Sequence, residues 1–313
     1  MYVEKRKTKE GKIKYWLSHS FREGGRVHKI RKLLGTNLGP KVLEERKEKA
    51  KQLILEEINQ YKIIQDPLHK ELSKEEIDFV KRLEREANLK VIHLSKKQWI
   101  RFSELFTYNT NAIEGSNLTS EEVKDIIEKD KWPAEKSKED IAEAYGVNEA
   151  VDYIRKTKDH LSLKLILELH RIVFKNSKDF AGQFRKKGQE VVVRDGRGNI
   201  VHEGAPQTRV ISLLKELVKW YEKYKNKYPA LILATVIHNQ FETIHPFGDG
   251  NGRVGRLLLN NVLIKHKLPP VNIDLKNRKR YYEVSQSYQN EHNLRPTIEF
   301  ILHEYKALKK ILK

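Results

Sequence analysis

The segment 229–241, which reads PALILATVIHNQF, constrains the fold more than any other part of the chain. Drawn as a helix it is apolar almost all the way round, and such a helix must be covered by protein on every side. The cover is expected from other segments that favour helix, among them 97–113, 161–174 and 208–225. We therefore expect a mainly α fold, a helical bundle with 229–241 at its centre.

Local signals place the ends of several helices. Ser73 with Glu76, and Thr119 with Glu122, have the spacing of a capping box at a helix start. Gly115 is expected to end the helix 97–113. The exception to the helical pattern is segment 190–202, where two short β-prone runs flank Asp195-Gly196 and predict a hairpin.

The first 39 residues predict a small β-meander. The runs 2–7, 13–21 and 26–34 are β-prone, with turns expected at 9–12 and 23–25. Three strands alone bury little surface, and a helix over 42–58 is a candidate cover for one face. We expect three parts: a basic β-meander module at 1–39, a helical linker at 40–72 and a catalytic domain at 73–313.

The chain of 313 residues holds 62 Lys and Arg against 43 Asp and Glu, a net charge of +19, and no cysteine. Disulfides, thiol catalysis and thiolate metal sites are thereby excluded. No apolar run approaches the ~20 residues of a bilayer span. The first ten residues lack the apolar segment of a secretory signal. We therefore expect a cytoplasmic protein with no membrane association.

The basic charge is unevenly distributed: residues 1–39 have a net charge of +8, and residues 101–150 a net charge of −6. The basic strands with Tyr15, Trp16 and Phe21 could lie against nucleic acid, as the strands of some DNA-binding sheets do. Alternatively, 1–39 is a docking or homodimerisation module with a solvated basic face. We slightly favour the second interpretation, because aromatic residues in a small sheet more often form its core.

Directly after the apolar helix comes IHPFGDGNGRVGR at 244–256, followed by a second apolar helix. Its glycines let backbone N–H groups approach a ligand, and the helix N-terminus favours an anion. Arg253 and Arg256 lie three residues apart in the first helical turn and suit phosphate oxygens. Asp249 could hold Mg²⁺ between phosphates, and His245 suits a general base. The pattern predicts a nucleotide phosphate site with its own proton acceptor.

This spacing is neither that of a P-loop nor that of a Rossmann fingerprint. Segment 245–256 resembles the signature of the Fic (Fido) family, HPFx[DE]GNGRxxR, and matches every fixed position. Upstream, TNAIEG at 110–115 resembles the family's inhibitory motif, [ST]xxxE[GN]. Further similarity lies at Leu169-His170 and at 182–185, so the resemblance covers roughly residues 75–300. It implies a Fic-type helical bundle with a β-hairpin flap, in which an inhibitory helix, here near 97–115, precedes the core.

Most Fic proteins transfer AMP from Mg-ATP to a Ser, Thr or Tyr hydroxyl of a protein, so the resemblance implies a protein adenylyltransferase, a nucleotidyltransferase. His245 would deprotonate the target hydroxyl and Asp249 would bind Mg²⁺. Asn251 and the loop amides would hold the α- and β-phosphates, and the two arginines the β- and γ-phosphates. The residues implied in ATP binding are Phe247, Gly248, Asp249, Gly250, Asn251, Gly252, Arg253 and Arg256.

Glu114 resembles the family's inhibitory glutamate, which pairs with the second motif arginine, here Arg256, and takes the place of the γ-phosphate. Thr110 and Gly115 belong to the same motif. The resemblance therefore implies autoinhibition. Some family members also use this glutamate to position a water for removing AMP, and the sequence leaves that activity open. The alternative function is a nucleic-acid-associated regulator that uses the Fic core as a nucleotide sensor.

Three further features have two interpretations each. Segment 190–202 resembles the family's flap, which aligns a target peptide by β-augmentation. However, HEGAP at 202–206 departs from the family pattern. An ordinary surface hairpin is therefore equally expected. For the spacing of His238, Glu242 and His245, packing or hydrogen bonding is favoured over a zinc site. A basic aromatic cluster could line the adenine or ribose, although a solvated helix face is favoured. Its members are Arg278, Arg280, Tyr281 and Tyr282.

Overall fold

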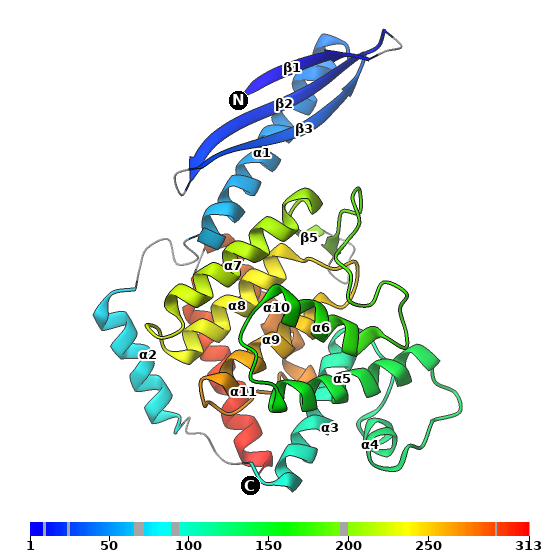
Figure 1. Ribbon diagram of the computed structural model, residues 1–313, viewed down its shortest axis with the longest axis vertical. Helices are drawn as coiled ribbons and strands as arrows, with labels where there is room; N and C mark the ends of the chain where they lie inside the picture. The colour runs from blue at the N-terminus through cyan, green and yellow to red at the C-terminus, as the bar shows by residue number, and fades with distance from the viewer. Residues whose placement is uncertain are drawn as a thin grey trace. The chain divides into compact units, whose positions relative to one another are not determined.

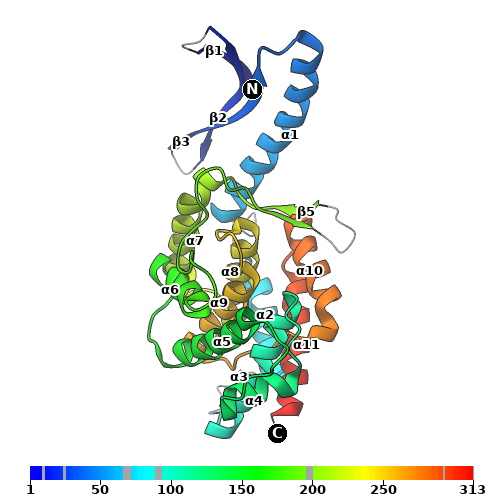
Figure 2. The ribbon, with the colours of Figure 1, turned by 90° about the vertical axis from the view of Figure 1, so that its right-hand side faces the viewer.

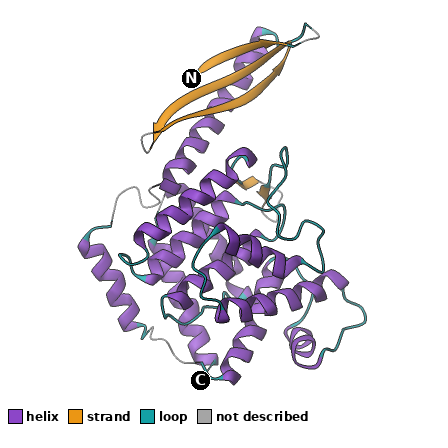
Figure 3. Cartoon of the chain, in the orientation of Figure 1, coloured by secondary structure: helices purple, strands orange, loops and turns teal. Residues whose placement is uncertain are grey.

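A computed structural model describes residues 1–8, 11–23, 26–65, 72–88, 94–194, 200–291 and 293–312. The chain divides into two compact units, 1–66 and 67–313. The described residues are mainly helical (Figures 1 and 3), with a three-stranded sheet in the first unit and a two-stranded sheet in the second. The mainly α fold with a small N-terminal β-meander is confirmed.

The first unit is an antiparallel sheet covered on one face by a helix. Its elements are β1 (Tyr2–Lys7), β2 (Ile13–Glu23), β3 (Arg26–Thr36) and α1 (Pro40–Gln65). Leu17, Ile30 and Leu34 of the sheet form one core with Ala50 and Ile54 of α1. The expected turns at 9–12 and 23–25 lie partly outside the described residues.

Helix α1 differs from the linker that the sequence suggested over 40–72. Since its apolar side forms the core of the sheet, Pro40–Gln65 belongs to the first compact unit. An amphipathic helix is held mainly by the surface it buries, and the sheet supplies that surface here. Residues 66–71 lie outside the described residues.

The second unit is built around two adjacent buried helices, α8 and α9. Nearly every residue of α8 is buried, and α8 contacts α9, α7, α10, α11 and α2, as its all-round apolar character predicts (Figure 1). The helices of this unit are α2 (Lys74–Glu86), α3 (Lys96–Ile113), α4 (Ser120–Lys129), α5 (Lys138–Lys156), α6 (Leu163–Phe174), α7 (Val210–Tyr224), α8 (Ala230–Ile244), α9 (Asn251–Lys265), α10 (Arg278–Glu291) and α11 (Arg295–Ile311), with 3-10 turns at Gln207–Arg209 and Leu275–Asn277.

The predicted helix starts are confirmed. The Ser73 hydroxyl accepts a hydrogen bond from the Glu76 N–H, and the Thr119 hydroxyl accepts one from the Glu122 N–H. Each glutamate carboxylate in turn accepts a hydrogen bond from the N–H of the cap residue. A third capping box, Ser95 with Gln98, starts α3. Among the described residues, no helix has both the length and the apolar character needed to cross a membrane.

A short hairpin interrupts the helices where the sequence predicts one. Strands β4 (Val192–Arg194) and β5 (Ile200–Glu203) pair antiparallel, and the expected turn at Asp195-Gly196 lies outside the described residues. After β5 the backbone joins the end of α8, because the Ala205 N–H donates to the Ile244 carbonyl over 3.1 Å. The hairpin is thus fixed beside the loop that follows α8.

Candidate active site

The loop between α8 and α9 is held by unusual backbone angles and by one asparagine. His245 ends α8 in the left-handed region, with φ 52°, which costs a non-glycine residue about 1–2 kcal/mol. Gly250 has φ 80°, and a Cβ there would lie 2.2 Å from the ring of Phe174. The Asn251 side chain accepts from the Phe247 N–H and donates to the Phe247 carbonyl, both over 2.9 Å. These contacts close the loop directly before α9.

A buried histidine supports the loop from α6. The His170 ring stacks on Phe247 with their centroids 3.8 Å apart. Its Nδ1 accepts from the Gly182 N–H over 2.8 Å, so Nε2 carries the proton and donates to the Asp249 carbonyl over 3.2 Å. Burial lowers the pKa of His170 to about 4, which keeps the ring neutral.

Arg256 joins α9 to the segment 110–115 at the end of α3. Its Nη2 donates to Glu114 Oε1 over 2.7 Å and to the Thr110 carbonyl over 3.0 Å, and its Nε donates to the Thr110 hydroxyl over 2.7 Å. Arg256 is only 1% exposed. Burial alone would raise the pKa of Glu114, but the charge of Arg256 and its hydrogen bond outweigh that effect and lower it. The pair is therefore ionised.

The Glu114 carboxylate lies against the N-terminal turn of α9. A Cβ built on Gly252 would lie 2.1 Å from Glu114 Oε1, so only glycine leaves room for the carboxylate there. A helix N-terminus attracts anions through its unpaired N–H groups and its dipole. Glu114 therefore holds the position of an anion at the start of α9.

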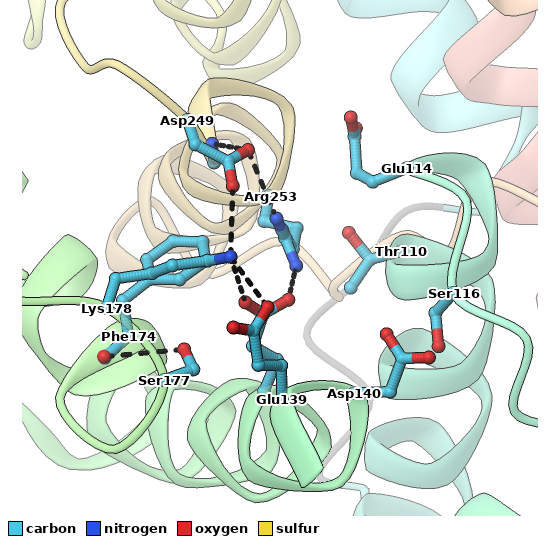
Figure 4. Close-up of polar contacts among 12 residues, drawn as sticks. Thr110, Glu114, Ser116, Glu139, Asp140, Phe174, Ser177, Lys178, Asp249 and Arg253 are labelled. Atoms are coloured by element: carbon cyan, nitrogen blue, oxygen red, sulfur yellow. Dashed lines mark hydrogen bonds and ion pairs between the residues drawn. The ribbon is translucent and has the colours of Figure 1, made fainter. Parts of the chain in front are cut away.

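Arg253 is directed to different partners from Arg256. It forms a buried ion pair with Glu143 of α5, and its guanidinium lies over the ring of Phe174 at 4.6 Å. Its Nη2 lies 3.5 Å from Asp249 Oδ1. Lys178 completes the network (Figure 4), with its Nζ 3.0 Å from Glu139, 3.8 Å from Glu143 and 3.8 Å from Asp249 Oδ2. Two cations thus flank the loop carboxylate.

A pocket opens beside the loop and contains most of the predicted site. Besides Glu114 and Arg256, its lining includes Glu242 of α8 and Tyr281 of α10. The Tyr281 hydroxyl lies 3.0 Å from His238 Nε2, and burial raises the pKa of Glu242 to about 8. The other lining residues are His245, Gly248, Asp249, Gly250, Asn251, Gly252, Tyr282, Ser285, Gln286 and Gln289.

The catalytic candidate His245 stands at the edge of this pocket, close to the hairpin. Its Nδ1 lies 3.2 Å from the Glu242 carbonyl, which assigns the proton to Nδ1 and the lone pair to Nε2. The buried Arg185 ties the hairpin to the loop, because its guanidinium donates to the carbonyls of Gln189, Ala205 and Ile244. A substrate segment added to the hairpin would therefore lie near His245.

The residues fit a magnesium ion that is bound mainly through a substrate. The Asp249 side chain is 48% exposed, and its Oδ2 lies 3.8 Å from Lys178 Nζ. In nucleotide sites Mg²⁺ commonly takes one or two carboxylates, phosphate oxygens and water. Among the described residues no group of three His, Asp or Glu side chains forms a ready-made metal site. Asp249 is therefore suited to hold an Mg²⁺ ion whose other ligands would be phosphate oxygens of a nucleotide and water.

The structure brings the two predicted motifs together and adds residues that the sequence did not single out. Tyr281 is buried and lines the pocket, against the solvated face that was favoured for it. Tyr282 also lines the pocket but is exposed, as are Arg278 and Arg280. Glu143 and Lys178 were missed, and the buried Arg185 was noted only as part of the similarity at 182–185, with no role. The only sequence signal for Glu143 was the acidic segment 101–150. Phe247 lies in the core with His170.

The second unit is a helical bundle in which the Glu114 carboxylate lies against the N-terminal turn of α9. Residues 160–263 match the Fic/DOC family. The chain is 31% identical over 203 residues to protein adenylyltransferase Fic of Aedes aegypti, covering 62% of this chain and 38% of that protein. It is also 31% identical over 210 residues to protein adenylyltransferase fic-1 of Caenorhabditis elegans, covering 65% and 40%.

The fold is shared with a Fic domain-containing signalling protein of Bacteroides thetaiotaomicron, with a TM-score of 0.63 at 21% identity. The likeness covers 74% of this chain and 95% of that one. The match to the Fic/DOC family covers residues 160–263 of this chain, a segment that includes the loop between α8 and α9. It spans about two fifths of the length of the two adenylyltransferases that it resembles.

Proposed function

We propose that the protein is a protein adenylyltransferase, which transfers AMP from Mg-ATP to a Ser, Thr or Tyr hydroxyl of a protein and is restrained by Glu114. One observation carries the proposal: Arg256 of the loop-helix motif holds Glu114 of the upstream motif over 2.7 Å. The names of the two similar proteins support the reaction. The alternative, a nucleic-acid-associated regulator that uses the Fic core only as a nucleotide sensor, is not favoured.

In the proposed reaction His245 Nε2 accepts the proton of the target hydroxyl as its oxygen attacks the α-phosphorus. The bond from the α-phosphorus to the bridging oxygen breaks, and pyrophosphate leaves with the electron pair. The N–H groups at the start of α9 are positioned to stabilise negative charge on the phosphates. Asp249 would hold Mg²⁺, which supplies positive charge to the triphosphate when bound. Lys178 and Arg253 keep the Asp249 carboxylate oriented.

Inhibition follows from the place of the Glu114 carboxylate. It occupies both the N-terminal turn of α9 and the counter-ion Arg256, where we expect the terminal phosphate of ATP. Two anions cannot share one arginine without strong repulsion. ATP therefore binds productively only when Glu114 moves away. A water positioned by this carboxylate would also permit the removal of AMP, which would be a second activity of the same site.

The test uses ATP labelled at the α-phosphate, with Mg²⁺, and a lysate of the source cell. We expect the Glu114→Gly variant to label protein more strongly than the unchanged chain, and the additional His245→Ala change to abolish labelling. ATP labelled at the γ-phosphate is the control, since it must leave protein unlabelled. If neither the unchanged chain nor Glu114→Gly labels any protein, itself included, AMP transfer is wrong. Mass spectrometry then identifies the target and its hydroxyl.

The hairpin β4–β5 is the proposed docking edge for the target, since its backbone lies beside the loop through Ala205 and Ile244. A homodimer and a cytoplasmic location stay predictions of the sequence.

A further inference from the structure

The sheet of the first unit has one face that no described element of that unit covers. Since side chains alternate along a strand, the residues paired across β1, β2 and β3 fall into two sets. One set, with Leu17 and Ile30, packs on α1, which lies on one side of the sheet (Figure 2). The other set forms what we call the open face: Tyr2, Glu4, Arg6, Lys14, Trp16, Ser18, Ser20, Arg22, Val27, Lys29, Arg31 and Leu33.

The open face is strongly basic. It holds five Lys or Arg residues against one carboxylate, Glu4, a net charge of +4. Glu4 Oε1 lies 2.5 Å from Lys29 Nζ, and Glu4 Oε2 lies 3.5 Å from both Arg6 and Arg31. Arg6 and Arg31 still have side chains 59% and 41% exposed. Three cations thus share one anion, which leaves charge available for a partner.

One cross-strand pair of the open face is unfavourable in the isolated sheet. Arg6 and Lys14 stand directly opposite one another on β1 and β2, and like charges in that position are destabilising. The same pair becomes favourable when phosphates lie between or above the cations. Two copies of this chain could not pair through the open face, because +4 would meet +4 in a self-complementary contact.

The dimensions and the uncharged members of the face also fit duplex DNA. Strands lie about 4.8 Å apart, so three strands span roughly 10 Å, close to the ~12 Å width of the DNA major groove. Strands of the length of β2 and β3 extend roughly 36 Å, about one turn of DNA. Tyr2 and Leu33, 50% and 53% exposed, offer apolar contacts of the kind that base edges accept. The deep, narrow major groove of duplex RNA does not admit such a sheet.

We propose that the open face docks duplex DNA, with its Lys and Arg side chains on the phosphates that border the major groove. This site is independent of the proposed AMP transfer, because none of its residues lies in the loop pocket. The aromatic residues named from the sequence divide accordingly: Tyr15 and Phe21 pack on the core, and Trp16 falls on the open face. The expectation that these aromatic residues form the core of the sheet is therefore met by Tyr15 and Phe21 but not by Trp16.

The test measures binding of the full chain to a fluorescent 20-base-pair duplex by anisotropy, as a function of salt. The Lys14→Gln, Arg31→Gln variant removes two charges from the open face. The matched control, Lys47→Gln with Lys51→Gln, removes two charges from α1, where those side chains are 36% and 51% exposed. Each phosphate contact contributes about 0.9 to the slope of log K against log salt. We expect the first variant to lower the slope by about 1.8 and the affinity at 0.1 M salt by roughly 50-fold.

A gain-of-function variant guards against loss through misfolding. Glu4→Gln removes the only carboxylate of the face, so we expect tighter duplex binding, whereas a damaged sheet would bind more weakly. His245→Ala should bind DNA like the unchanged chain. Equal losses for the two double variants would overturn the proposal, since binding would then follow total charge. Stronger binding of single-stranded DNA, duplex RNA or anionic vesicles than of duplex DNA would overturn it as well.

Discussion

Replacing Glu114 with alanine is expected to change two free energies in opposite directions. In the absence of nucleotide, the variant loses the charged hydrogen bond from Arg256 Nη2, which is 2.7 Å long. Such a bond contributes about 1.5–3 kcal/mol. Arg256 keeps its two bonds to Thr110 and remains buried, so we expect the free energy of unfolding to fall by about 2 kcal/mol.

Under the proposed function, the same change favours the binding of ATP. The terminal phosphate no longer has to displace a carboxylate from Arg256 and from the start of α9. If the lost bond is worth about 2 kcal/mol, the affinity for ATP rises about 30-fold, because 1.36 kcal/mol corresponds to a factor of ten. For Glu114→Gln we expect a free energy of unfolding and an affinity for ATP between those of the unchanged chain and those of Glu114→Ala. Its amide oxygen still accepts a hydrogen bond but carries no charge.

Urea denaturation gives the first free energy, and calorimetric titration with ATP and Mg²⁺ gives the second. Glu135→Ala is the control, because it removes one exposed carboxylate between α4 and α5 and should change neither quantity beyond about 0.5 kcal/mol. A variant that is destabilised but binds ATP as the unchanged chain does would refute the reasoning. Glu114 would then stabilise the fold without competing with phosphate.

Three further changes test the site. Burial raises the pKa of Glu242 to about 8, so the folded state retains a proton that the unfolded chain releases near pH 4–5. The free energy of unfolding should therefore fall by up to ~1.4 kcal/mol per pH unit as the pH rises from about 5 to 8. Glu242→Gln should flatten that slope in denaturation curves recorded across this range. Asn251→Ala leaves the N–H and carbonyl of Phe247 without their side-chain partner and should lower the free energy of unfolding by about 2–4 kcal/mol, measured in urea. Gly250→Ala combines φ 80° with overlap on the Phe174 ring, so we expect a loss of at least about 3 kcal/mol in the same assay.

The parts of the fold that follow from local chemistry could be predicted from the sequence. The buried α8 follows from its all-round apolar character, and the starts of α2 and α4 from their capping boxes. The meander follows from β-prone runs between turn residues. The extent of the first unit was less predictable, since the packing of α1 on the sheet is a tertiary contact that neither segment specifies alone.

The candidate site likewise has one part that the sequence predicts, the loop, and one part that it does not, the directions of the long side chains. The motif fixes which residues gather in the loop, because the glycines and Asn251 determine its backbone. It does not fix where a long side chain points. Arg253 and Arg256 are three residues apart and were expected to act together, yet Arg253 extends to Glu143 and Arg256 to Glu114. Those directions depend on which helices pack around α9, and no local pattern contains that information.

The different partners of the two arginines indicate how regulation and catalysis would be separated in the proposed enzyme. Glu143 is 6% exposed and holds Arg253 in place from α5, so this pair is a fixed support for Asp249. Glu114 caps the end of α3, and its side chain is 29% exposed, so it can leave Arg256 without unpacking a core. Movement of Glu114 alone would exchange a carboxylate for a phosphate at the start of α9 while Asp249, Asn251 and the loop keep their geometry. Under the proposed function, inhibition would then act on nucleotide binding and leave the arrangement of the reacting groups intact.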